Sequence, residues 1–591
     1  MNRKSVLAAI VFILFTALAA GAQTHLSVDI HDPVYRLIEL GELKGAVSRL
    51  SAVRPYSRSQ VVRILQEMWE NRSLFSAGER QTLQQTMERF DLPRTGLRHG
   101  NIGYSRDERS VQVGVDFKAD ARMNFHQPEE GYLDSLTRAY LRGDLFPWLS
   151  YFGSMGFTFD RVGYDASEPY EGLRYPAFVP YGFTKEWDAF HIFFGEDRYS
   201  DGTLDYPTIS YDLGMDLTAC FLEGDLVLRA ARLRREWGIA EGSLTLGGTA
   251  RPFIGAEVQV RLAPWLALSH VSGWLSSWAE EARSGKEPWP ELTELAPEER
   301  EEFENSLTYQ KLFTLQRLEL FPLPWLYLSV SSSMVGARRF EPGYLSPLIF
   351  SLIYQNVLAE NLDNMGLGID AAFTLAPYGR LYFSFFADEM EITGFRELFT
   401  RPRNMFAFQA GLKVPVPRLP LTEFVFQYTK IEPFTYAHFP TWYADHYLGV
   451  DTSYTQDGEN LAYPLPPNSD EFLVKLASLP LPRLAAGLEY RLIRHGDNPK
   501  KNPGDAAILG RIDGYYMPAA NQADKDFLHD GLYDFSHIVT LSGEYRLARA
   551  PVTLGASYSF VYTLWEPNDS GEPDRPNETR NILALSVKVF R

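Results

Sequence analysis

The chain has 591 residues and a formal net charge of −18, and 22% of its residues are charged. This acidity argues against nucleic acid and against an anionic membrane surface as partners, but it is compatible with a basic patch inside a pore. Cys220 is the only cysteine in the sequence, so neither a disulfide framework nor a cysteine-built zinc site is available. The 37 prolines, 44 glycines and 14% aromatic residues are typical of a β-rich protein with many turns.

Residues 1–22 are predicted to be a secretory signal peptide. Arg3 and Lys4 precede an apolar run from Val6 to Ala20 that is short for a bilayer span, and Ala20-Gly21-Ala22 offers a small-x-small cleavage site. The alternative is a membrane anchor that is kept. We expect export to the outer membrane. After residue 22 the sequence has no run of about 20 apolar residues, so a membrane location would require strands.

Residues 23–100 predict a small α-helical bundle. Asp32-Pro33 can start a helix that Gly41 can end, while Ser57 to Gln60 and Ser76 to Glu79 form two capping boxes. Three short helices are too few to hold a large core. We therefore expect them to pack on the periplasmic side of the remaining chain, with an independent bundle on a flexible tether as the alternative.

Residues 101–591 are mainly β and predict a transmembrane antiparallel β-barrel. Strands of about ten residues alternate apolar and polar side chains, and each pair is joined by a very short turn, while long polar, aromatic-rich stretches separate the pairs. The short turns lie near Phe146-Pro147, Glu223-Gly224-Asp225, Pro264-Trp265, Pro322-Leu323-Pro324, Pro377-Tyr378-Gly379, Pro415 to Pro420, Pro480-Leu481-Pro482 and Arg549-Ala550-Pro551.

Strand length and charge favour a membrane barrel over a soluble sandwich. The polar faces carry both signs of charge, as a wet lumen would, and aromatic residues expected at strand ends suit the membrane interfaces. Eight turns give sixteen strands, and a first strand at 109–122 and a last at 580–590 bring the total to about eighteen. The ending Phe590-Arg591 departs from the usual terminal aromatic residue. The expected aromatic residues are Trp148, Trp265, Trp325, Tyr378 and Tyr558.

Catalysis is not favoured. The sequence has no H-E-x-x-H, G-x-S-x-G, P-loop or paired-cysteine motif. Asp388, Glu389 and Glu391 could serve acid–base chemistry, but such a group is more often a solvated strand end or a cation-binding loop. We predict no catalytic residue, no metal and no cofactor.

Two groups of residues are candidates for binding polysaccharide. In the aromatic stretch 434–447, flat rings could stack on sugar faces while His side chains bond hydroxyls; the alternative is that this loop folds back and plugs the barrel. In the second group, arginines at a lumen mouth could pair with carboxylates or phosphates; the alternative is that they pair with lumen acids. The candidates are Tyr436, His438, Trp442, Tyr443 and His446, and Arg232, Arg234, Arg235 and Trp237.

Short segments in order along the chain resemble the Wzi-type capsule assembly family. Each segment alone is weakly specific. They are Pro33-Val34-Tyr35, Arg54-Pro55-Tyr56-Ser57-Arg58, Arg234-Arg235-Glu236-Trp237-Gly238, Gly242-Ser243-Leu244-Thr245-Leu246, Asp363-Asn364, Asp388-Glu389, Gln427 to Tyr436 and Pro467-Asn468-Ser469-Asp470-Glu471.

The resemblance implies an eighteen-stranded outer-membrane barrel that holds surface polysaccharide without turnover, with its helical bundle at the periplasmic mouth. The expected partners are outer-membrane lipid and surface polysaccharide, and the expected state is a monomer. A porin for passive or selective uptake is the alternative function. The stretch 161–207 stays unplaced, because 190–194 could be an extra strand or an inward loop.

Overall fold

A computed structural model describes most of the chain. The described residues are 24–91, 96, 99–106, 109–125, 132–162, 189–192, 208–250, 252–275, 311–337, 341–358, 363–390, 401, 404–438, 441–443, 448–450, 452–456, 459–496, 527–528, 533–566 and 577–590. The predicted signal peptide lies outside them.

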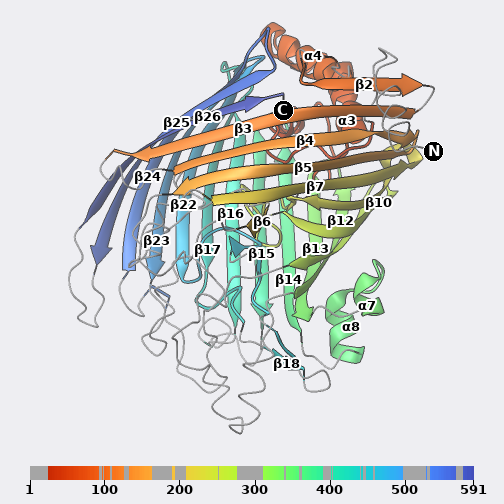
Figure 1. Ribbon diagram of the computed structural model, residues 1–591. Helices are drawn as coiled ribbons and strands as arrows, with labels where there is room; N and C mark the ends of the chain where they lie inside the picture. Colours follow the sequence, from red (N-terminus) through yellow and green to blue (C-terminus); the bar gives the residue numbers. More distant parts are fainter. Residues whose placement is uncertain are drawn as a thin grey trace.

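The protein is a closed antiparallel barrel of eighteen strands (Figure 1), which confirms the predicted fold. In order around the wall the strands are β3 (Arg109–Asn124), β4 (Tyr132–Phe146), β5 (Leu149–Val162), β7 (Thr208–Phe221), β8 (Leu226–Leu233), β10 (Phe253–Ala263), β11 (Leu266–Leu275), β12 (Lys311–Leu323), β13 (Leu326–Ala337), β14 (Asn364–Leu375), β15 (Gly379–Glu389), β16 (Met405–Pro415), β17 (Thr422–Ile431), β22 (Ser469–Leu481), β23 (Leu484–Gly496), β24 (Tyr533–Arg546), β25 (Val552–Glu566) and β26 (Glu578–Val589).

All eight predicted short turns join neighbouring strands at one end of the barrel, at the top of Figure 1. The turn between β7 and β8 contains a 3₁₀ helix, η5 (Leu222–Gly224). We call this the short-turn end, and the opposite end, to which the longer connections run, the long-loop end. The first and last wall strands, β3 and β26, pair and close the barrel, in register from Phe117 opposite Val589 to Asn124 opposite Ile582.

Over part of the wall, including β3, the outer face is apolar and the inner face polar, the reverse of a soluble protein. On β3, Val113 and Val115 are 39% and 48% exposed, whereas Gln112 and Asp116 are 1% and 5% exposed. Successive side chains of a strand point to opposite faces, so this strand turns its valines outward and its polar groups into the lumen. This arrangement is what lipid outside and water inside require.

Aromatic side chains ring the short-turn end. Trp148, Trp265, Trp325 and Tyr378 lie in the turns and are exposed, as predicted. Tyr558 was wrongly expected at a strand end. It lies in the middle of β25, where it faces outward between β24 and β26.

Short strands extend the wall at two places. β2 (Asn101–Arg106) pairs with the first residues of β3, on the edge that β26 occupies further along. β6 (Ala189–Ile192) pairs with the start of β7, beyond the end of β8. Part of 190–194 is therefore an extra strand, while the other residues of 163–207 lie outside the described part.

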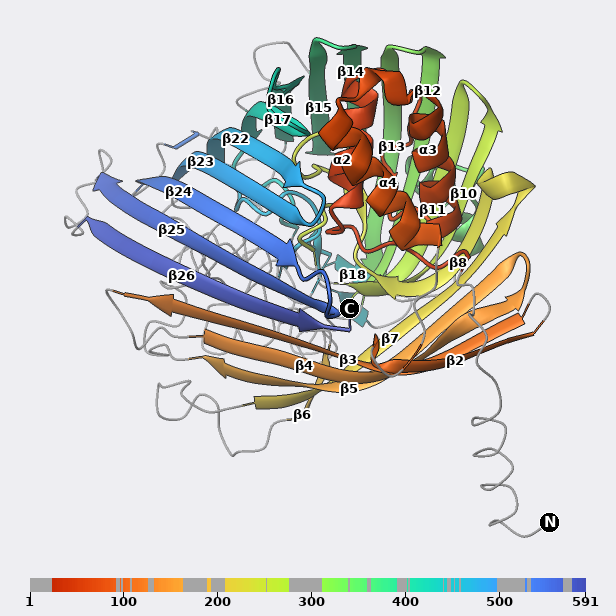
Figure 2. The same ribbon diagram turned by 90° about the horizontal axis from the view of Figure 1, so that it is seen from above.

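A helical domain closes much of the short-turn end. It comprises α2 (Val34–Leu43), α3 (Arg58–Glu70), the 3₁₀ helix η1 (Arg72–Leu74) and α4 (Ala77–Asp91). Figure 2 shows these helices lying over the side of the barrel near β11 to β15. No helix in the described residues is long and apolar enough to cross a membrane.

The predicted capping boxes start two of these helices. Ser57 and Gln60 exchange side-chain and backbone hydrogen bonds at α3, and Ser76 and Glu79 do so at α4. Gly41, by contrast, does not end α2, which runs on to Leu43.

The domain is docked on the barrel, not tethered beside it. Gln60 donates to the Gly224 carbonyl (3.2 Å), the Leu421 amide donates to Glu79 (3.1 Å), and Leu421 and Leu479 belong to the apolar core of the helices. The helices thus pack on the barrel, at its short-turn end; the periplasmic location of this end stays a prediction.

Candidate functional site

The connection from β8 to β10 folds into the lumen. Its strand β9 (Glu236–Trp237) pairs with β1 (Val53–Arg54), which precedes α3. Trp237 is completely buried, and its carbonyl accepts hydrogen bonds from the Ser243 hydroxyl (2.7 Å) and from Arg317 on β12 (3.1 Å). The connection is therefore fixed to both the wall and the helical domain.

The connection from β17 to β22 enters the lumen from another side and packs on the first. The Tyr436 hydroxyl donates to the Leu244 carbonyl (2.9 Å), and the Gly247 amide donates to the Leu461 carbonyl (2.7 Å). Both connections share one apolar core with inward-facing residues of the wall. We call their described parts, 234–250, 252, 432–438, 452–456 and 459–468, the luminal plug. The hairpin β20 (Thr455–Gln456) and β21 (Glu459–Asn460) lies within it.

The luminal plug buries three of the six predicted binding residues that carry a ring. Trp237 and Tyr436 are fully buried, and His438 is 7% exposed with its Nδ1 2.8 Å from the Thr452 hydroxyl. Tyr436 and His438 thus lie in a loop folded into the barrel, the alternative stated for that stretch, and Trp237 of the arginine group is buried with them. Burial, together with the neighbouring Tyr454 and Asp388, raises the pKa of the Tyr436 hydroxyl well above its ordinary value.

The remaining aromatic candidates stay predictions. Trp442 and Tyr443 belong to β18 (Thr441–Tyr443), which pairs with β19 (Leu448–Val450). The structure does not describe their side chains, and His446 lies outside the described residues.

The predicted arginine group splits in two. Arg235 is buried, where its Nε lies 2.9 Å from Glu257, its other nitrogens donate to backbone carbonyls, and its guanidinium lies over the Phe253 ring. It is thus paired with a lumen acid and cannot reach a ligand. Arg232 and Arg234 instead line a cavity beside the luminal plug.

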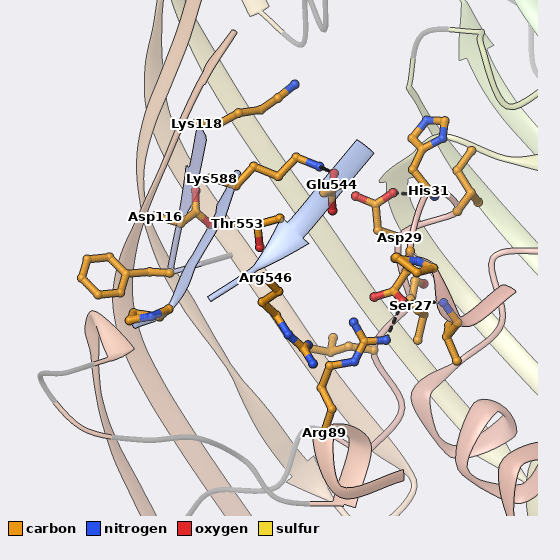
Figure 3. Close-up of a pocket in the computed structure, with 18 of the residues that line it drawn as sticks. Ser27, Asp29, His31, Arg89, Asp116, Lys118, Glu544, Arg546, Thr553 and Lys588 are labelled. Atoms are coloured by element: carbon orange, nitrogen blue, oxygen red, sulfur yellow. Dashed lines mark hydrogen bonds and ion pairs between the residues drawn. The ribbon is translucent and has the colours of Figure 1, made fainter. Parts of the chain in front are cut away.

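This cavity has a volume of about 850 Å³ and is bounded by the helical domain, the segment 26–34 and the wall strands around the barrel closure. Figure 3 shows Lys118, Lys588 and Arg546 on the wall side and Asp29, His31 and Arg89 on the helical side. The lining positions on β3 run from Gln112 to Arg122. At a rise of about 3.3 Å per residue and a tilt of about 40°, these ten steps span roughly 25 Å of the barrel axis. The cavity is therefore long enough for an extended chain.

The cavity is cationic although the protein is acidic. Among the described lining residues there are eleven arginines and lysines and seven aspartates and glutamates. The basic residues are Arg58, Arg89, Lys118, Arg122, Arg138, Arg142, Arg232, Arg234, Arg483, Arg546 and Lys588, and the acidic ones are Asp29, Asp32, Asp116, Asp120, Asp212, Asp216 and Glu544.

Several of these charges neutralise each other. The Arg138 Nε contacts both oxygens of Asp116 (2.8 and 2.9 Å), and Lys588 contacts Glu544 (2.9 Å). Arg142 has a different environment: its Nε donates to the Gln112 side chain (2.7 Å) and its guanidinium lies 4.6 Å from the Tyr140 ring centre.

Within the described part of the chain, neither Arg142 nor Arg234 forms an ion pair. Two charged groups are thus available to an anionic ligand. Sequence reasoning missed Arg142, although the alternation of β4 could have placed it on the lumen face.

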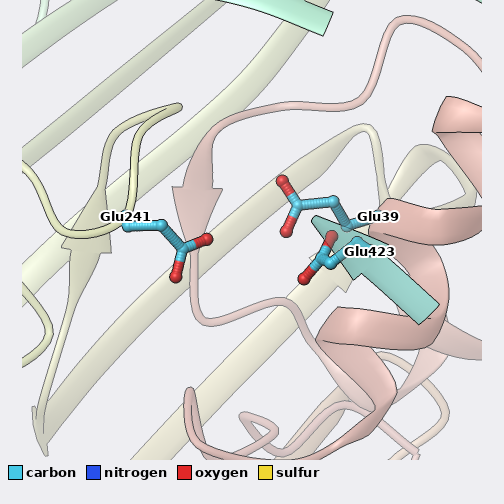
Figure 4. Close-up of side chains that lie close together, drawn as sticks. All are labelled: Glu39, Glu241 and Glu423. Carbon is cyan, nitrogen blue, oxygen red and sulfur yellow. The ribbon is translucent and has the colours of Figure 1, made fainter. Parts of the chain in front are cut away.

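An acidic group elsewhere joins the helical domain to the barrel. Glu39 of α2, Glu241 of the luminal plug and Glu423 of β17 hold carboxylate oxygens within 4.8 Å of one another (Figure 4). Lys413 supplies the cation, with its Nζ 2.7 Å from Glu39 and 2.9 Å from Glu241, and Lys475 adds a second contact to Glu241 (2.5 Å). This arrangement is a structural ion-pair network and needs no metal ion.

Electrostatics within this network keep two carboxyls charged. Burial favours the protonated form of Glu39 and Glu241, but the positive charges around them outweigh it. Lys413, Arg54 and Arg380 hold the pKa of Glu39 below its ordinary value, and Lys413 and Lys475 hold that of Glu241 well below it.

Of the carboxylates considered for catalysis, Asp388 and Glu389 contact the luminal plug. Asp388 is buried and accepts a hydrogen bond from the Tyr436 amide (2.5 Å), so it fixes the luminal plug. Glu389 lies 3.5 Å from the His438 ring, and Glu391 lies outside the described residues.

The fold was compared with known proteins. No family model and no curated protein matches the sequence. Among solved structures, this chain aligns with Wzi of Escherichia coli, described as an outer membrane protein involved in group 1 capsule assembly and a carbohydrate-binding β-barrel. The TM-score is 0.54 at 13% identity, over 96% of this chain and 99% of that chain. The fold is similar to that of Wzi. The resemblance seen in the sequence is thereby confirmed at the level of the fold.

Two further solved structures align with lower TM-scores. Acinetobacter baumannii OccAB2 gives a TM-score of 0.40 at 10% identity, over 81% of this chain and 98% of that chain. Pseudomonas aeruginosa OprD gives 0.36 at 11% identity, over 80% and 94%.

Proposed function

We propose that this chain is a non-catalytic outer-membrane barrel that binds an acidic polysaccharide and holds it at the cell surface. The cationic cavity beside the luminal plug is the observation that carries the proposal. A net excess of positive charge in this cavity, in a protein with a net charge of −18, attracts polyanions and gives neutral chains no such attraction. The fold similarity to a carbohydrate-binding barrel supports it.

The ligand would lie along β3 and β4. Arginine forms paired hydrogen bonds with carboxylates and phosphates, so Arg142 and Arg234 would bind the acidic groups of the chain. The half-buried ring of Phe152 also lines the cavity, beside Arg138, and would supply an apolar contact for a sugar ring. The short-turn end with its helical domain would face the periplasm, and the long loops the exterior.

Binding of defined polysaccharides tests this function. Purified protein in detergent would be titrated calorimetrically with polygalacturonate as the acidic probe and dextran as the neutral one. Arg142→Glu combined with Arg234→Glu should weaken polygalacturonate binding at least tenfold. The matched control is Arg72→Glu combined with Arg80→Glu, which makes the same charge change at two exposed positions of the helical domain.

Two results would refute the proposal: equal binding of dextran and polygalacturonate, or equal affinity of the double variant and the control with Arg72→Glu and Arg80→Glu. Barrel assembly of each variant would be checked by the different gel mobility of heated and unheated samples.

An anion-selective porin is the second candidate, and the same cavity favours it because it runs beside the luminal plug. Single-channel recording in planar bilayers separates the two functions. A large, steady, anion-selective conductance would favour the porin, whereas a polysaccharide-holding barrel with a blocked lumen would conduct little.

A further inference from the structure

Part of the outer wall of the barrel is polar. On β11, Trp274 is 50% exposed and outward-facing, and His270 and Ser272 share its face, whereas Val271 between them belongs to the lumen core. The register places Gln316 of β12 opposite His270, and Ser332 of β13 opposite Gln316. These side chains therefore point toward the lipid, where a polar group without a partner costs several kcal/mol in order of magnitude.

A helical hairpin covers this polar wall. It consists of α7 (Pro342–Leu345) and α8 (Ser351–Leu358), and in Figure 1 it lies outside the barrel beside the lower part of β13 and β14. The polar wall residues are all buried, and all of them except His270 hydrogen-bond to the hairpin: His270, Ser272, Thr314, Gln316 and Ser332.

Gln316 is the main attachment of the hairpin. Its amide nitrogen donates to the Ser346 and Ile349 carbonyls (2.7 and 2.6 Å), and its amide oxygen accepts from the Ser351 amide (2.8 Å). The Leu352 amide adds a bond to the Ser332 hydroxyl (3.1 Å). These bonds satisfy backbone groups of the connection between the two helices, which lipid could not satisfy.

The opposite face of the hairpin is apolar, and among the described residues nothing covers it. Residues 342–358 contain no charged residue, in a chain where 22% of residues are charged. Apolar side chains are exposed along the whole segment: Leu345, Leu348, Ile349, Ile353, Val357 and Leu358. An apolar surface of this extent is unusual in contact with water.

The depth of the hairpin places this surface beside the acyl chains. Ser332 is seven residues from Trp325, which belongs to the aromatic ring of the short-turn end. Seven residues at about 3.3 Å and a tilt of about 40° correspond to roughly 18 Å along the barrel axis. The apolar band of such barrels is about 25 Å tall, so Ser332 lies within the band, in the half nearer the long-loop end.

We propose that the α7–α8 hairpin is embedded in the bilayer, with its polar face sealing the wall of β11 to β13 and its apolar face packed against lipid acyl chains. Lipid is the occupant because the apolar face continues the lipid-facing surface of the wall: Val330 and Ile369, next to the hairpin on β13 and β14, are exposed and outward-facing. The proposal requires the membrane barrel but not the polysaccharide ligand.

Quenching by brominated lipid tests the position of the hairpin. Cys220 is the single, buried cysteine, so Cys220→Ser gives a background for single-cysteine variants. Ile353→Cys would be labelled with an environment-sensitive fluorophore and reconstituted in phosphatidylcholine vesicles with or without bromine on the acyl chains. Leu381→Cys on the lipid-facing side of β15 is the positive control, and Leu74→Cys in the helical domain is the control for water.

We expect brominated chains to quench the label at position 353 as strongly as the label at position 381, and several-fold more than the label at position 74. Quenching no greater than at position 74 would overturn the proposal. So would protection from both lipid and aqueous quenchers with cross-linking between copies, which would identify a second copy as the occupant. Val357→Cys repeats the measurement if Ile353→Cys does not assemble.

Discussion

Replacing Trp237 by alanine should open the luminal plug while the barrel wall stays closed. Trp237 is fully buried in the core shared by the two inserted connections, and truncating a buried Trp or Phe to Ala costs roughly 3–5 kcal/mol. The indole N–H has no hydrogen-bond partner among the described residues, so removing it offsets about 1 kcal/mol of this loss of stability. The net loss of about 2–4 kcal/mol increases the population of the opened plug roughly 30- to 1000-fold, because each 1.4 kcal/mol is tenfold.

Native-state proteolysis measures this population. Cleavage within the connection between β8 and β10 requires the opened plug, so its rate follows the open population when reclosing is fast. Trp237→Phe is the matched control, because the smaller ring keeps most contacts and removes the unpaired N–H, at a net cost within about 1 kcal/mol. Equal cleavage rates for the Ala and Phe variants, with both barrels showing heat-dependent gel mobility, would refute the packing argument.

Acidification should loosen the helical domain. The pKa of Glu39 is held below its ordinary value, so its stabilising effect is complete above roughly pH 4.5 and is lost as the pH falls through the lower folded-state pKa. Glu39→Gln should reduce the protease resistance of α2 at pH 7 and flatten its change between about pH 5 and pH 3; an unchanged acid profile would contradict this. Alanine at both Trp442 and Tyr443 should lower retention of polysaccharide on cells, measured with labelled polymer, and unchanged retention would exclude β18 from binding.

The barrel could be predicted from the sequence because lipid imposes a simple rule. A strand that crosses a bilayer must alternate, and its backbone must pair on both sides, so the valines of β3 and the short turns define the wall. The aromatic residues around the short-turn end could be predicted from the same turns. Tyr558 was misplaced because its position within β25 depends on where the strand starts, which composition does not determine.

The candidate site was predictable only in part. The residues between β8 and β10 follow no strand period, so the sequence could not show that Arg235 turns to Glu257 while Arg234 faces the cavity. The sequence allowed two positions for the loop of Tyr436, exposed at the surface or folded into the barrel. Only the structure shows that this loop packs on the connection between β8 and β10, which lies far away in the sequence. The α7–α8 hairpin carried a signal that was overlooked, namely the uncharged segment 342–358.

The seam between β3 and β26 joins residues more than 450 positions apart. The barrel therefore cannot close until β26 has been synthesised and has reached β3. Before this pairing, the open seam gives the two inserted connections a lateral route into the lumen. Loss of β26 would leave β3 and β25 with unpaired edges. We expect such a product to be degraded and not to assemble as a less stable barrel.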